Sequence, residues 1–169
     1  MGDLAPPSSA AWRSGVIKDF TRSELFDRTF QEGMDLVEET ASYLDGAGRQ
    51  DSKLLSRNAA LAYAAESMRL TTRLMQVASW LLVQRAVREG DMAPEAACEQ
   101  SYRLGAESDT AKVGDGLPHP LAHLLDRSER LFERVRHLDR RMYVETTDEH
   151  EAPHPVLAAQ ERLKDAFQG

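Results

Sequence analysis

The amino-acid sequence predicts an all-α protein, organised as a three-helix bundle with a long central helix. Three observations support this fold class. Apolar residues recur every three or four positions along three long stretches, as they do on one face of a helix. Segments that contain glycine or proline separate these stretches. No segment shows the sustained alternation of apolar and polar residues that indicates a strand, so sheet-based nucleotide-binding folds are excluded.

Composition limits the class of protein further. The chain has 169 residues and a net charge of −7, which disfavours nucleic-acid binding. Its single cysteine, Cys98, cannot form an intramolecular disulfide, as is usual in a reducing cytosol. The uncharged run from Leu74 to Gln84 is much shorter than the roughly 20 residues that cross a membrane, and the N-terminus lacks a secretory signal pattern. We therefore expect one domain and a cytoplasmic location.

The first 20 residues are rich in Pro, Ser and Ala, so residues 1–20 are expected to form a disordered arm. The first helix is expected to begin near Thr21 or Ser23, either of which can cap it. Its apolar stripe comprises Phe26, Phe30, Met34, Val37, Ala41 and Leu44. The opposite face of this helix is acidic, and the segment GAGRQ at 46–50 is expected to end the helix.

The second helix is expected to run from the cap pair Asp51 and Ser52 to the residue before Gly90, a length of roughly 58 Å. Its large apolar residues repeat every seven positions. They are expected to form its core seam, and small residues beside them would let another helix approach closely. The seam residues are Leu54, Leu61, Met68, Met75 and Leu82.

Further apolar residues on the second helix lie outside this seam, among them Val77, Trp80 and Val83. A helix that is apolar around most of its circumference is normally buried around most of it. Two neighbouring helices and a second subunit could together bury it. We therefore infer an oligomer and predict that Val77, Trp80 and Val83 belong to a dimer interface.

The remainder of the chain is expected to hold a short helix within 92–105, a loop within 105–116 and a third helix that begins at Pro118 and Pro120. The heptad pattern of the third helix comprises Leu121, Leu124, Ser128, Leu131, Val135, Leu138 and Met142. Residues 21–144 thus form the expected bundle domain. Residues 145–169 comprise an acidic linker and a short amphipathic tail. The tail is expected to bind a partner through Val156, Gln160, Leu163 and Phe167.

No pattern predicts catalysis, a metal site or a cofactor. His119 and His123 are four residues apart, with Asp126 nearby, and such a face can bind a metal ion. These residues lie opposite the heptad stripe, so a solvated start of the helix is the preferred interpretation. For the charged residues around Arg73 we prefer a salt-bridge set to an acid–base pair. The acidic first helix and the basic third helix are interpreted as solvated faces or, alternatively, as complementary surfaces within the fold.

Three strings of residues carry a resemblance to a known family. They are LFDRTFQEGMDLVEETASYLDGAGR (25–49), LSRNAALAYAAESMRLTTRLMQVASWLLVQRAVREGDM (55–92) and RLG (103–105). The sequence resembles the RcdA family, whose members are regulators of CtrA degradation. The two long strings match closely, and the third helix matches more loosely through the spacing of its leucines. No binding residues are implied by this resemblance.

The resemblance implies a three-helix bundle that forms a homodimer, has a flexible C-terminal tail and lacks enzymatic activity. It further implies an adaptor for the ClpXP protease in cell-cycle control. Such an adaptor works with CpdR-like and PopA-like regulators, helps to deliver cargo such as CtrA, and is recruited to the cell pole. A structural or scaffolding helical dimer fits the predicted fold equally well. An enzyme fits poorly, because no polar cluster is predicted on facing helices.

Overall fold

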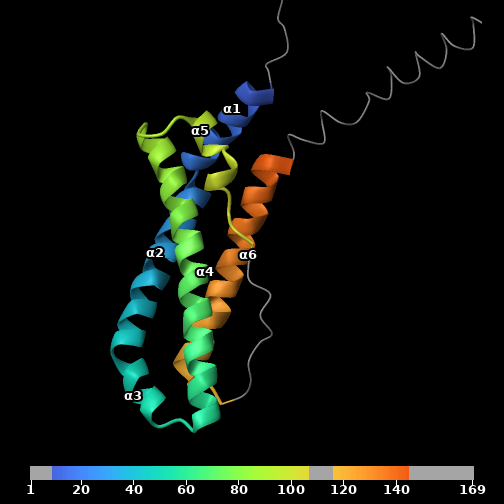
Figure 1. The fold of residues 1–169 in the computed structure, drawn as a ribbon. Helices are drawn as coiled ribbons and strands as arrows, with labels where there is room; N and C mark the ends of the chain where they lie inside the picture. Colours follow the sequence, from blue (N-terminus) through green and yellow to red (C-terminus); the bar gives the residue numbers. More distant parts are fainter. Residues whose placement is uncertain (1–8, 107–115, 145–169) are drawn as a thin grey trace, which may run out of the picture.

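The computed structural model describes residues 9–106 and 116–144, and all regular structure within these ranges is helical, as predicted (Figure 1). The three long helices each contact the other two. They are α2 (Glu24–Asp45), α4 (Arg57–Glu89) and α6 (His119–Val144). Shorter helices pack at the two ends of this assembly (Figure 1). These are α1 (Ser9–Thr21), α5 (Pro94–Ala97), the 3-10 turn η1 (Gln100–Tyr102) and, at the opposite end, α3 (Ala47–Lys53).

Helix α1 corrects the expectation of a disordered arm over residues 1–20, because residues 9–21 are helical. Ile17 is buried in the core, and the Phe20 ring lies 5.9 Å from that of Trp80. The Ser14 hydroxyl donates to Glu95 of α5 at 2.6 Å and thereby lowers the pKa of that carboxyl. The abundance of Pro, Ser and Ala suggested disorder, whereas the order of residues 9–21 depends on contacts with distant helices. Residues 1–8 lie outside the described ranges.

Helix α2 begins at Ser23, one of the two predicted caps, whose hydroxyl accepts a hydrogen bond from the Phe26 N–H at 3.2 Å. Its buried face differs in part from the predicted stripe, since Ala41 is exposed. The buried positions are Phe26, Thr29, Gly33, Leu36 and Thr40. A Cβ atom at Gly33 would lie 2.7 Å from Leu81 Cδ1, so glycine permits the close approach of α4.

The predicted second helix is in fact two helices, α3 and α4, separated near Leu55. Helix α4 begins after Ser56, whose hydroxyl accepts a hydrogen bond from the Ala59 N–H at 3.3 Å. The expected cap Asp51 instead lies inside α3 and accepts a hydrogen bond from the Tyr43 hydroxyl at 3.0 Å. Burial, together with this bond, raises the pKa of Tyr43. Helix α4 ends at Gly90 as predicted, where a φ of 81° favours glycine.

The core confirms the predicted inner face of α6 and reverses that of α4. On α6, the buried positions include Leu121, Leu124, Ser128, Leu131, Val135 and Met142. On α4, the seam expected in the core is exposed. The exposed fractions of its residues are 65% for Leu61, 72% for Met68, 65% for Met75 and 51% for Leu82, and Leu54, which lies between α3 and α4, is 87% exposed. No helix within the described ranges is long and apolar enough to cross a membrane.

The reversal on α4 has a physical cause. Its buried face also repeats every seven residues, through Glu66, Arg73, Trp80 and Val87. Two of these residues are charged, and a sequence pattern that scores apolar residues passes over such a face. A seven-residue repeat identifies a face of a helix, but it does not identify the neighbour that covers that face.

Candidate interaction surfaces

The charged residues on the inner face of α4 are satisfied within the fold. Glu66 is buried and pairs with Arg69 at 2.6 Å. Arg73 crosses to α6, where it donates to Ser128 Oγ at 2.8 Å and to the Leu125 carbonyl at 3.3 Å. These contacts support the interpretation of a structural salt-bridge set, since buried charges persist in proteins when they are paired and hydrogen-bonded.

Two of the residues predicted at a dimer interface, Val77 and Trp80, are buried in the core of the single chain, at 1% and 2% exposure. The Trp80 indole N–H donates to Asp139 of α6 at 2.9 Å. Side chains in this position have no exposed area to contribute to a dimer, which corrects their assignment. Val83 is half-buried and packs against the core.

Asp139 also explains the string RLG at 103–105. Its carboxylate pairs with the Arg103 guanidinium at 3.3 Å and accepts a hydrogen bond from the Leu104 N–H at 3.4 Å. The segment that follows α5 is thereby attached to both α4 and α6. Sequence reasoning missed Asp139, because a lone aspartate between arginines on a helix resembles a solvated residue.

The acidic surface of α2 pairs with basic residues of the other long helices. Glu39 and Glu32 pair with Arg127 and Arg134 of α6 at 2.5 and 2.6 Å, and Asp27 pairs with Arg88 of α4. The alternative interpretation of complementary helices is thus realised. These side chains remain a third to a half exposed, so each pair contributes less than about 1 kcal/mol and mainly favours one arrangement of the helices.

The exposed seam of α4 is the most apolar exposed feature of the described residues. We call Leu61, Met68, Met75 and Leu82 the α4 stripe. Between these residues lie exposed small ones, namely Ala64, Ala65, Thr71, Thr72 and Ser79. A cavity of about 330 Å³ opens beside Met75, between α2 and α4. Alternating large and small side chains on an exposed helix face suit the close packing of another helix.

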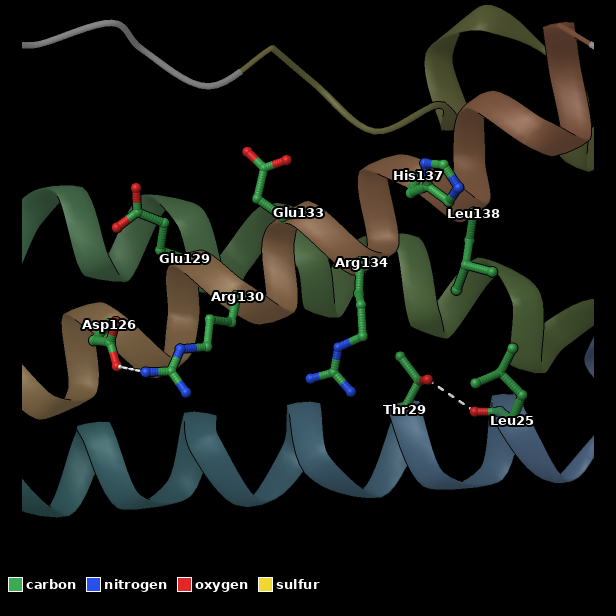
Figure 2. A pocket seen from close by; sticks show the side chains of 9 residues that line it. All are labelled: Leu25, Thr29, Asp126, Glu129, Arg130, Glu133, Arg134, His137 and Leu138. Atoms are coloured by element: carbon green, nitrogen blue, oxygen red, sulfur yellow. Dashed lines mark hydrogen bonds and ion pairs between the residues drawn. The ribbon is translucent and has the colours of Figure 1, made fainter.

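A second surface is a groove of about 640 Å³ between α2 and α6 (Figure 2). We call it the α2–α6 groove. On the α2 side lie Leu25, which is 49% exposed, and Thr29, whose hydroxyl donates to the Leu25 carbonyl. Arg130, paired with Asp126, lies on the α6 side. The remaining lining residues all belong to α6: Glu129, Glu133, Arg134, His137 and Leu138.

The remaining residues that the sequence suggested as sites are either exposed or outside the described ranges. His119 and His123 are exposed at the start of α6. Among the described residues, no group of three His, Cys, Asp or Glu side chains is placed to hold a metal ion. The tail residues Val156, Gln160, Leu163 and Phe167 lie outside the described ranges, so their role in partner binding stays a prediction.

The described residues therefore belong to an all-helical protein whose packed helices leave apolar surfaces exposed. The chain belongs to the family described as "Protein of unknown function (DUF1465)", whose model matches residues 17–167. The crystal structure of RcdA from Caulobacter crescentus CB15 is similar to it, with a TM-score of 0.65 and 73% sequence identity. That alignment covers 75% of this chain and 98% of that chain, which confirms the resemblance to RcdA. No curated protein matches.

Proposed function

We propose that this protein is a non-enzymatic adaptor that helps a ClpXP-type protease to degrade cell-cycle regulators such as CtrA. The observation that supports the proposal is the 73% identity with RcdA over 98% of that chain. The adaptor works with CpdR-like and PopA-like response-regulator partners in the cytoplasm and at the cell pole. The exposed surfaces of the helices are suited to such protein contacts.

A reconstituted degradation assay tests this function. Purified ClpXP, a CpdR-like and a PopA-like regulator, and CtrA are combined with and without this protein, and the loss of CtrA is followed over time. An adaptor accelerates the loss in proportion to its own occupancy. An unchanged rate, from a protein that still binds the regulators, would favour the alternative function of a scaffolding dimer.

We further propose that the adaptor is a homodimer in which the α4 stripes of two copies pack against each other. The stripe is symmetric about Thr71 and Thr72, because Met68 and Met75 lie at equal distances on either side, as do Leu61 and Leu82. In an antiparallel pair, Met68 of each copy would therefore lie across from Met75 of the other, as two-fold symmetry requires. The small threonines at the axis would permit close approach of the helices.

A further inference from the structure

Met75 stands between two cavities on the exposed side of α4. The first, which we call the α2–α4 cavity, has a volume of about 330 Å³ and lies between two helices that run side by side in Figure 1. The second, of about 390 Å³, lies between α4 and the segment 101–105. Because Met75 lines both cavities, it is a ridge of the α4 stripe with a hollow on each side.

The two cavities differ in the chemistry of their walls. The α2–α4 cavity is lined mainly by aliphatic side chains, namely Val37, Ala41, Leu44, Leu74, Met75 and Ala78. The second cavity presents hydroxyl, amide and guanidinium groups, which belong to Thr72, Gln76, Ser79, Ser101, Tyr102 and Arg103. An apolar side chain is therefore better accommodated in the α2–α4 cavity, where it displaces water from carbon rather than from polar groups.

Thr40 gives a second observation about the α2–α4 cavity. It lines the cavity and is only 4% exposed, and its hydroxyl has no hydrogen-bond partner among the described residues. A buried hydroxyl without a partner costs free energy. In the single chain, the cavity therefore lacks both an apolar filling and an acceptor for one hydroxyl.

We propose that, in the homodimer, the partner's Met68 fills the α2–α4 cavity and that its sulfur, a weak acceptor, receives the Thr40 hydroxyl hydrogen. The inference rests on the proposed antiparallel pairing of the α4 stripes and adds the residue with which the second copy completes the cavity. In that pairing the partner's Met68 lies across from Met75. Met75 is in the middle of the α4 stretch that lines the cavity, from Thr71 to Ala78, so the partner's Met68 is at the right level.

Crowding at the interface directs this side chain to one side of Met75. Met68 is 72% exposed and Met75 is 65% exposed, and two such side chains that meet end to end cannot fill the same space. The flexible side chain of methionine suits an irregular gap beside the ridge. A cavity of about 330 Å³ has room for it, since one water molecule takes up only about 30 Å³ in the liquid.

Disulfide cross-linking between two copies tests this placement. In a Cys98→Ser background, a tagged chain with Met68→Cys is mixed with an untagged chain that carries either Ala41→Cys, at the α2–α4 cavity, or Ser101→Cys, at the second cavity. After mild oxidation, we expect a covalent heterodimer with Ala41→Cys and none with Ser101→Cys on a non-reducing gel. A cross-link to Ser101→Cys alone, or equal cross-linking to both, would overturn the proposal.

Thr72→Cys distinguishes a failure of this inference from a failure of the proposed dimer. Thr72 lies beside the symmetry axis, so two copies of this variant should cross-link whichever cavity the partner's Met68 enters. If they do so while Met68→Cys links to neither cavity, the placement is wrong and the antiparallel dimer stands. If the Thr72→Cys copies also stay unlinked, the antiparallel dimer and the placement are both wrong.

A matched pair of larger side chains provides an independent measurement. Ala41→Phe narrows the α2–α4 cavity and Ser101→Phe narrows the second one, and both positions are exposed. With unchanged circular dichroism, Ala41→Phe should raise the dimer dissociation constant at least about tenfold, because the partner's Met68 loses its buried position, and Ser101→Phe should change it less than about twofold. Equal effects, or the reverse order, in sedimentation equilibrium would contradict the proposal.

Discussion

At the scale of single residues, Asp139 connects three parts of the fold. Asp139→Ala removes the acceptor of the buried Trp80 indole N–H and the partner of Arg103. We expect the free energy of unfolding to fall by about 3 kcal/mol, because an unsatisfied buried donor and a broken ion pair are both costly. Urea denaturation measures this change.

Arg136 on the same helix is the matched control for Asp139. Its side chain and that of its partner Glu133 are more than a third exposed, so Arg136→Ala should cost less than about 1 kcal/mol. Equal effects of the two substitutions would show that the Asp139 contacts do not hold the 100–105 segment on the helices.

Gly48 in α3 is a second position where one atom decides the packing. A Cβ atom there would lie 2.6 Å from the Tyr63 hydroxyl and 2.7 Å from the Tyr43 carbonyl oxygen. Gly48→Ala should therefore lower the free energy of unfolding by about 1–3 kcal/mol, despite the better helix propensity of alanine. Gly15→Ala in α1, where the added atom meets nothing within 4 Å, should instead raise it by about 0.5–1 kcal/mol. Thermal unfolding of both variants is the measurement, and a stabilised Gly48→Ala protein would refute the packing argument.

At the scale of elements, the two faces of α4 should respond differently to substitution. Met68→Glu with Met75→Glu places charges on the exposed α4 stripe, so the proposed dimer should dissociate while the helical circular dichroism stays unchanged. Trp80→Ala in the core should lower the free energy of unfolding by about 3–5 kcal/mol. Sedimentation velocity at micromolar concentration reports the mass, and a monomeric unmodified chain would exclude the dimer.

At the scale of the whole molecule, the tail and the helical body should have separable roles in delivery. We predict that a chain ending at Val144 keeps the mass of the proposed dimer but no longer accelerates CtrA degradation in the reconstituted assay. The reason is that it lacks Val156, Gln160, Leu163 and Phe167, which are predicted to bind a partner. Gel filtration provides the first measurement and the degradation rate the second. Unchanged acceleration by the truncated chain would assign delivery to the helical body alone.

The amphipathic parts of the fold could be predicted because their apolar residues lie on one face only. Helix α6 is the clearest case, since its predicted stripe from Leu121 to Met142 is the face that the structure buries. The ends of two helices were predictable because a residue type that caps helices stands at each of them: Ser23 caps the start of α2, and Gly90 caps the end of α4. The order of α1 was not predictable, because a short helix gains its stability from contacts with distant elements, which its local sequence does not reveal.

The sequence by itself determined the all-α class, the third helix and the membership of a family. Only the tertiary structure decided which face of α4 is the core. Both faces of that helix repeat every seven residues, and the inner one contains Glu66 and Arg73. Arg73 can be buried because Ser128 Oγ and the Leu125 carbonyl of α6 accept its hydrogen bonds. These acceptors lie about fifty residues away in the sequence, so a local sequence pattern does not reveal them. The same packing leaves the α4 stripe and the α2–α6 groove exposed, so the surfaces available to partners follow from the fold rather than from local sequence.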